Sequence, residues 1–114
     1  MHEASVARSL LATILAEAQK QAGKPVHGKI SCGQLNKLNQ EVFVLAFDAL
    51  AVGSPCAGMT FDIEIKPFRA TCSACECVFP VAFSTAACPR CASEAFNLLP
   101  DAPLILETIE FQEE

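Results

Sequence analysis

The chain has 114 residues, of which 52% are hydrophobic and 18% are charged. This length suits one ordinary domain or a small core with an insertion, and the apolar content favours a packed core over intrinsic disorder. The formal net charge of -5, with no cluster of Lys and Arg, argues against nucleic-acid binding. No apolar run approaches the roughly 20 residues that span a bilayer, and no secretory signal is visible, so we expect a cytoplasmic protein.

The first predicted elements are a helix and a strand separated by a glycine. Apolar residues recur at three- and four-residue steps through residues 4–22, which predicts an amphipathic helix with Gly23 as its left-handed C-terminal cap. Residues 25–33 have the alternation of a half-buried strand. Cys32 then lies on the buried face as a small hydrophobic side chain, and His27 lies on the solvated face.

A second helix and two more strands follow. A helix fits residues 40–52, with Asn39 as its N-cap and Gly53 as its C-terminal cap. Apolar and polar residues alternate through residues 61–66, which predicts a strand, and the strand-forming residues of 104–111 predict the last one. The side chains expected to face the core are Phe43, Ala46, Phe47 and Leu50 of the helix, and Phe61, Ile63 and Ile65 of the strand.

Together these elements predict an α+β fold, in which two helices pack on a small three-stranded sheet and bury every apolar face. We expect this core to comprise residues 1–67 and 100–114. The segment between them, residues 68–99, loses the apolar periodicity and is rich in cysteine. It is therefore predicted to be a separate insertion, placed before the last strand.

Four cysteines of the insertion have the spacing of a metal site. Cys72 and Cys75 form one C-x-x-C pair, and Cys88 and Cys91 form a second. Four thiolates on two tight turns give Zn²⁺ a closed tetrahedral shell, as in a zinc ribbon. With seven cysteines in total and no secretory signal, a disulfide framework is the weaker interpretation. We therefore predict that these four cysteines bind a structural zinc ion.

Other interpretations of the cysteines stay open. An iron site with four thiolates has the same ligands and would make an electron carrier. A redox-active C-x-x-C pair normally follows a strand and opens a helix, which residues 71–77 do not resemble. Cys77 could replace Cys75 as a ligand or remain a spare thiol nearby. The aromatic side chains expected to cover the metal-binding turns are Phe79, Phe83 and Phe96.

The N-terminus, Met1-His2-Glu3, offers a second set of metal ligands. The α-amine of Met1, the backbone nitrogen of His2 and the His2 imidazole can close on one metal ion as fused chelate rings. Such a nitrogen-rich, planar set suits Ni²⁺ or Cu²⁺ better than Mg²⁺ or Ca²⁺. The first N–H groups of a helix have no intrahelical acceptor, so the His2 amide can give its proton up without breaking the helix. Glu3 could ligate through its carboxylate or its backbone nitrogen, or merely complement the positive helix end.

In combination, these motifs resemble those of the HypA-type hydrogenase nickel-incorporation proteins. The resemblance rests on the initiating Met-His-Glu, on a first helix that begins with residues 4–10, and on the late pair of C-x-x-C turns. The order of elements agrees along nearly the whole chain. Two departures occur: Gly33-Gln34-Leu35-Asn36 replaces the Gly-Glu-Leu run common in the family, and Cys77 stands where a Gly is usual.

The resemblance implies a nickel metallochaperone rather than an enzyme. Such proteins deliver Ni²⁺ to the large-subunit precursor of a maturing nickel–iron hydrogenase, and in some organisms to urease, together with a nickel-handling GTPase. Zinc would be structural and nickel the transferred metal. The family's nickel motif falls on Met1, His2 and Glu3, and its zinc ligands fall on Cys72, Cys75, Cys88 and Cys91.

Two rival functions remain at this point. A zinc-stabilised interaction module would use the same four cysteines and transfer no metal. An enzyme that uses Cys and His is the more distant rival, because no base and orienting group can be placed from the sequence. A zinc ion with four sulfur ligands also has no open position for water, which argues against a zinc hydrolase.

Overall fold

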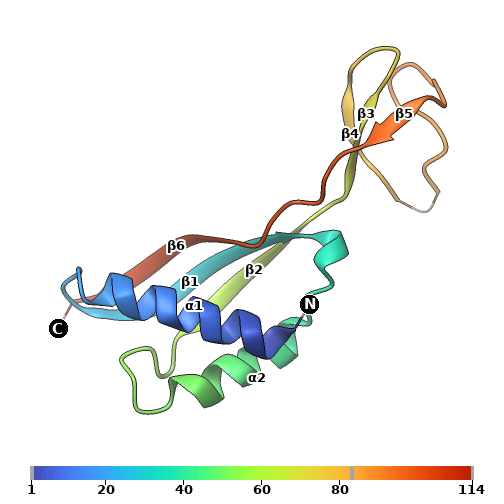
Figure 1. Cartoon of the computed structure of the whole chain (residues 1–114). Helices are drawn as coiled ribbons and strands as arrows, with labels where there is room; N and C mark the ends of the chain where they lie inside the picture. The colour runs from blue at the N-terminus through green and yellow to red at the C-terminus, as the bar shows by residue number, and fades with distance from the viewer. Residues whose placement is uncertain (1, 83, 114) are drawn as a thin grey trace.

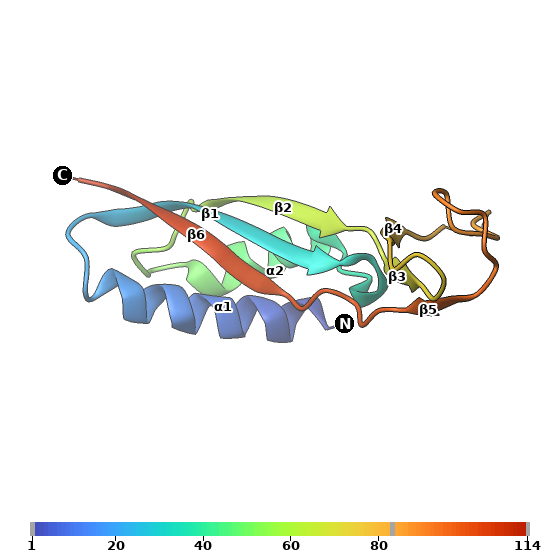
Figure 2. The same cartoon turned by 90° about the horizontal axis from the view of Figure 1, so that it is seen from above.

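The protein consists of an α+β core and a small second sheet that extends from one end of it (Figure 1). The computed structural model describes residues 2–82 and 84–113. Two helices lie on one side of the core sheet, as Figure 2 shows from above. The core elements are α1 (Glu3–Ala18), β1 (Lys24–Gly33), the short 3-10 helix η1 (Gln34–Asn36), α2 (Gln40–Ala51), β2 (Thr60–Lys66) and β6 (Ile105–Gln112). The predicted α+β class is confirmed.

β1 is the central strand of the core sheet, between β2 and β6. It pairs with β2 in parallel and with β6 in antiparallel orientation. The parallel pair needs a crossover connection, which η1 and α2 supply. The strand order therefore places a helix over the sheet and brings the segments before and after the cysteine-rich insertion to the two sides of one strand.

The core beneath the helices is built on aromatic contacts. Phe43 and Phe47 of α2 are fully buried, and their ring centroids lie 5.3 and 4.7 Å from the ring of Phe61 on β2 in edge-to-face arrangements. Gly28 of β1 leaves room for this cluster, because a Cβ atom there would lie 2.9 Å from the Phe61 ring. Cys32, predicted to be a small buried hydrophobic side chain, is fully buried in the same core.

The second helix begins at Gln40 as predicted and ends at Ala51, one residue before the predicted end. The Asn39 side chain accepts a hydrogen bond from the Val42 backbone nitrogen at 3.1 Å, as an N-cap does. Gly53 follows the helix with φ +80°, in the left-handed region that ends many helices. Across residues 2–82 and 84–113, no helix combines the length and hydropathy needed to cross a membrane.

The first helix ends earlier than the sequence predicted. It stops at Ala18, and Gly23 is not its cap. Lys24 already pairs with Gln112 of β6, so the chain must turn within residues 19–23. Gly23 has φ +98°, and a Cβ atom there would lie 2.6 Å from the Gln112 carbonyl oxygen. The glycine therefore permits the start of β1 beside β6 rather than the end of the helix.

Three side chains depart from their predicted surroundings. Leu50 and Ile65, expected to be buried, are 37% and 39% exposed. Ile65 lies near the end of an edge strand, where fewer neighbours cover it. His27 is not simply solvated: its Nδ1 lies 2.7 Å from Thr60 Oγ1 and its Nε2 lies 3.1 Å from Asp62 Oδ2. Both partners come from β2, so this histidine links two strands on the polar face of the sheet.

The cysteine-rich insertion forms a second antiparallel sheet, which we call the ribbon. Its strands were not predicted, because each has only three or four residues and shows no periodicity. Phe79 is buried in its small core, with its ring centroid 5.4 Å from that of Phe96. Phe83, also expected in this core, lies outside the described residues. The strands, in the order β4-β3-β5, are β3 (Arg69–Cys72), β4 (Val78–Pro80) and β5 (Phe96–Leu98).

Phe47 is expected to contribute most of its stabilising effect through burial. Replacement by Ala should lower the free energy of unfolding by about 3–5 kcal/mol, because a cavity remains beneath α2. The matched control on the same helix is Leu45→Ala, whose side chain is 70% exposed and should change the value by less than about 0.5 kcal/mol. Urea unfolding of the metal-loaded protein, followed by far-ultraviolet circular dichroism, measures both. Equal effects of the two substitutions would contradict this description of the core.

Candidate metal sites

The structure brings together the four cysteines of the two C-x-x-C pairs. The sulfur atoms of Cys72, Cys75, Cys88 and Cys91 all lie within 4.8 Å of one another. Two of these separations are 3.4 Å, between Cys72 and Cys91, and 3.7 Å, between Cys75 and Cys88. A tetrahedron with Zn–S bonds of about 2.3 Å has sulfur–sulfur edges of about 3.8 Å, whereas a disulfide bond measures about 2.05 Å. The cluster therefore fits a tetrahedral zinc ion and is not a pair of disulfides.

The two cysteine turns are built alike. In each, the N–H of the first cysteine donates to the carbonyl oxygen five residues later: Cys72 to Cys77 at 2.9 Å, and Cys88 to Ser93 at 2.8 Å. Each turn also contains one residue with left-handed backbone: Glu76 (φ +63°) and Ala92 (φ +64°). This repeated geometry aims both sulfurs of each pair inward, and it makes Cys77 the counterpart of Ser93 rather than of a ligand.

Cys77 lies outside the cluster of four sulfurs that the described residues form. Its thiol donates to the carbonyl oxygen of Val78 at 3.6 Å. Cys75, not Cys77, completes the tetrahedral set. The geometry therefore favours Cys75 over Cys77 as the second ligand of the first pair. β3 also ends at Cys72 and leads into a turn rather than a helix, which argues against a thioredoxin-like redox pair.

Backbone N–H groups lower the pKa values of these thiols, whereas burial raises them. The N–H groups of Ala74 and Cys75 each lie 3.4 Å from Cys72 Sγ. The hydrogen bond from Cys75 contributes most, and the pKa of the Cys72 thiol falls to about 6. The N–H of Cys77 lowers the pKa of Cys75, but burial and the neighbouring sulfurs outweigh it and raise this pKa to about 12. Four adjacent thiolates would repel one another. A divalent metal would compensate their negative charge, and its binding would release the protons of the thiols.

The second predicted site lies at the start of α1. Met1, the first predicted nickel ligand, lies outside the described residues. His2 is exposed and extended, with φ -90° and ψ 105°, and its side chain makes no capping hydrogen bond. Its carbonyl oxygen accepts the first helical hydrogen bond, from the Val6 nitrogen at 3.1 Å. The backbone nitrogens that precede Val6 are therefore those for which a helix offers no acceptor.

The Glu3 carboxylate is engaged in a tertiary contact that the sequence did not indicate. Its Oε2 accepts a hydrogen bond from the backbone nitrogen of Asn39 at 2.9 Å. This bond, followed by one from the N–H of Glu3 itself, lowers the pKa of the Glu3 carboxyl. Glu3 thereby ties the start of α1 to the start of α2.

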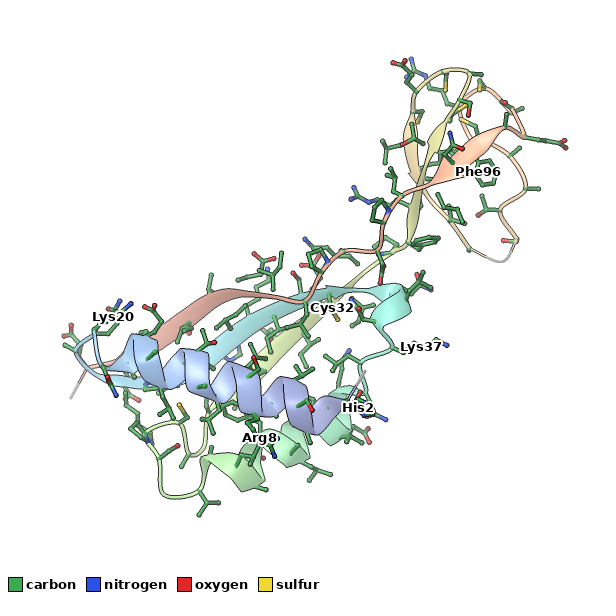
Figure 3. All side chains as sticks on the ribbon, viewed as in Figure 1. His2, Arg8, Lys20, Cys32, Lys37 and Phe96 are labelled. Atoms are coloured by element: carbon green, nitrogen blue, oxygen red, sulfur yellow. The ribbon has the colours of Figure 1, made fainter. Side chains whose placement is uncertain are left out.

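The two candidate metal sites lie toward the same end of the core. α1 begins at the end of the core sheet from which the ribbon extends, and both views of the chain show this (Figures 1 and 2). Figure 3 shows His2 and Lys37 at this end and Lys20 at the opposite one. A protein that approaches this end can therefore reach both the first helix and the ribbon.

Comparison with known proteins agrees with these observations along the whole chain. The family model described as "Hydrogenase/urease nickel incorporation, metallochaperone, hypA" matches residues 1–111. Hydrogenase maturation factor HypA of Chlorobium limicola is 31% identical over 114 residues, which cover 99% of this chain and 98% of the relative. The protein of the same name from Desulfitobacterium hafniense is also 31% identical over 114 residues, covering 99% of this chain and 100% of the relative.

Solved structures give the same result. The solution structure of the Ni metallochaperone HypA from Helicobacter pylori is 28% identical, with a TM-score of 0.63 and 100% of both chains covered. A second solution structure of a HypA protein is 29% identical, with a TM-score of 0.71 and coverage of 100% of this chain and 98% of the other. The chain therefore belongs to the HypA family, whose members are nickel metallochaperones of hydrogenase maturation and not enzymes.

Proposed function

We propose that this chain is a cytoplasmic nickel metallochaperone that binds Ni²⁺ through Met1, His2 and Glu3. It would deliver the ion to the large-subunit precursor of a hydrogenase, with a nickel-handling GTPase as accessory partner, and to urease where that enzyme is present. The observation that carries this proposal is the exposed, extended His2 directly before the first turn of α1, in a chain of the HypA family. A solvent-accessible terminal site also suits reversible delivery better than a buried site would.

The proposed nickel ligands are nitrogens. The Met1 amine and the His2 backbone nitrogen close a small chelate ring, and the His2 imidazole closes a second ring on the same ion. Oε2 of the Glu3 carboxylate accepts the Asn39 hydrogen bond, and the Glu3 backbone nitrogen is the donor that this residue would offer to the metal. These groups must lose protons to bind, so nickel affinity should fall as the pH falls. Selectivity against Cu²⁺, which such ligands prefer, must come from metal availability and from partners.

We further propose that Cys72, Cys75, Cys88 and Cys91 bind one structural Zn²⁺. The separations of their sulfurs and the N–H groups directed at them support this assignment. The protein then has two units: a core of residues 1–67 and 100–114, and a zinc-bound ribbon of residues 68–99. Four sulfur ligands leave the zinc no open position, so its role is to fold the ribbon. A zinc-stabilised module without transferred nickel is the alternative that the next experiment addresses.

Removal of the proposed chelate should abolish tight nickel binding. Isothermal titration of Ni²⁺ into zinc-loaded protein should show binding that is weakened about 100-fold or more by His2→Ala, and equally by one extra residue before Met1. This expectation follows because loss of an outer-shell group alone costs about 10- to 100-fold. The control is His27→Ala, which removes the other histidine, bonded to Thr60 and Asp62, and should leave nickel affinity unchanged. If both terminal variants bind nickel as the original chain does, the chelate is wrong.

The role of Glu3 can be separated from its charge. Glu3→Gln keeps the backbone nitrogen and an oxygen that can accept from Asn39, so nickel affinity should change by less than about threefold, or about 0.7 kcal/mol. Asp62→Asn, which alters a carboxylate far along the chain, is the matched control in the same titration. A large loss of affinity in Glu3→Gln alone would show that the carboxylate is a nickel ligand.

Zinc content should distinguish Cys75 from Cys77. Cys75→Ser removes a member of the sulfur cluster and is expected to lose bound zinc and the folded ribbon, measured by elemental analysis and by amide NMR spectra. Cys77→Ser, two residues away, should retain one zinc ion per chain and native spectra. The opposite pattern would make Cys77 the ligand. Iron with visible charge-transfer bands in the purified protein would contradict the zinc assignment itself.

A further inference from the structure

We infer that residues 33–39 form a joint that fixes the orientation of the ribbon relative to the start of α1, and that Gln34 and Asn36 are positioning residues for nickel handover. The joint comprises the end of β1, the η1 turn and the residues that lead to α2. It contacts both polypeptide segments that connect the core to the ribbon, and it also contacts Glu3. The role in nickel handover rests on the function proposed above, whereas the role in fixing the orientation of the ribbon does not.

The joint holds the segment that returns from the ribbon to β6. The carbonyl oxygen of Ala102 accepts two hydrogen bonds, one from the Gly33 backbone nitrogen and one from the Asn36 side-chain amide, each at 2.9 Å. Two donors on one acceptor restrict both the position and the rotation of that peptide group. Pro100 and Pro103 flank it, and their fixed φ angles stiffen the segment further.

The same joint holds the segment that leaves β2 for the ribbon. The side-chain oxygen of Gln34 accepts a hydrogen bond from the Phe68 backbone nitrogen at 3.4 Å. Phe68 in turn accepts from the Val81 nitrogen at 2.7 Å, so the contact passes directly into the ribbon. The amide oxygen of Gln34 thus holds this connection.

A close packing contact supports the hydrogen bonds. A Cβ atom on Gly33 would collide with the carboxylate of Asp101, which therefore lies directly against the Gly33 backbone. Gly33 has φ -74°, which any residue adopts, so the glycine is required for space and not for backbone freedom. Both Asp101 oxygens are buried, and within the described part of the chain they have no hydrogen-bond partner. Burial of such a group is costly, so surrounding contacts must hold it in place.

The joint also reaches the proposed nickel site. Lys37 closes η1 by donating from its backbone nitrogen to the Gln34 carbonyl oxygen at 3.4 Å, with left-handed φ +54°. Two residues later, the Asn39 nitrogen donates to the Glu3 carboxylate at 2.9 Å. One seven-residue segment thus contacts the start of α1 and both connections to the ribbon. A recipient that touches both metal-binding regions would meet them in one fixed geometry.

Asn36→Ala tests the joint in the full-length, zinc-loaded protein. Residual dipolar couplings report whether core and ribbon share one alignment. In the original chain one alignment tensor should fit the couplings of both core and ribbon, and in Asn36→Ala the ribbon should need a separate tensor of smaller magnitude. The matched control is Asn97→Ala, which removes an exposed amide that bonds Ser73 within the ribbon at 3.3 Å and should behave as the original chain does.

A second pair of variants tests the packing contact. Gly33→Ala should loosen the ribbon as Asn36→Ala does, and the double variant Gly33→Ala with Asp101→Ala should restore its order, because the colliding carboxylate is then gone. If core and ribbon keep one alignment in both Asn36→Ala and Gly33→Ala, residues 33–39 do not fix the orientation of the ribbon.

Handover is measured separately. Nickel affinity and zinc content of Asn36→Ala should equal those of Asn97→Ala, while hydrogenase maturation in cells that lack their own HypA should fall about 2- to 30-fold, the range expected for a residue that couples two sites. Unchanged maturation despite a loosened ribbon overturns the positioning role. Absence of nickel binding in the original chain would instead overturn the proposed function, and the dipolar couplings would still decide the joint.

Discussion

The pairing of β1 determines where every functional part of this molecule lies. Its neighbour β2 runs parallel to it and its neighbour β6 runs antiparallel, so β2 ends and β6 begins at the same edge of the sheet. In the register, Lys66 at the end of β2 lies opposite Gly33, and Ile105 at the start of β6 lies opposite Ser31. An insertion between these strands can extend only from the carboxyl end of β1. α1 precedes β1 through a short turn and runs back along it, so the first helix also begins at that end. The topology alone brings the terminus and the ribbon together.

The parts of the structure that local patterns specify were predictable from the sequence. The two helices, the cap at Asn39 and the paired cysteines follow from periodicity and spacing within a few residues. The chelating groups of Met1 and His2 were predicted from their own chemistry, and resemblance to the HypA family supplied their expected role in nickel delivery. What the sequence could not indicate depends on distant partners. Gly23 was interpreted as a helix cap because its close approach to β6 is invisible in sequence, and Asn36 gave no sign that it bonds Ala102. The ribbon strands were not predicted because elements of three or four residues are too short to show a hydrophobic period.

The two proposed metal sites differ in how tightly the protein encloses the ion. In the ribbon, backbone N–H groups and four sulfurs surround one position, where a bound cation would offset the mutual repulsion of thiolates. At the start of α1, the donors belong to a chain end that solvent reaches, and the Glu3 carboxylate is committed to Asn39. One arrangement is suited to permanent retention and the other to exchange. The hydrogen-bonded segment of residues 33–39 connects the region of the proposed structural zinc ion to the region of the proposed transferred nickel ion.

Cys77 and Ser93 occupy equivalent positions in the two cysteine turns, which leaves the Cys77 thiol outside the sulfur cluster. Cys32 and Cys56 are sealed in the core, and four further thiols converge on one point in the ribbon. Cys77 is the seventh cysteine and is half-buried beside that cluster, with its thiol directed at a backbone carbonyl. If the four clustered cysteines hold the proposed zinc ion, Cys77 is the thiol that neither the metal nor the core engages. A fluorophore attached there would sit next to the ribbon turn without replacing a ligand, and it would report on docking from a position that the native sequence already provides.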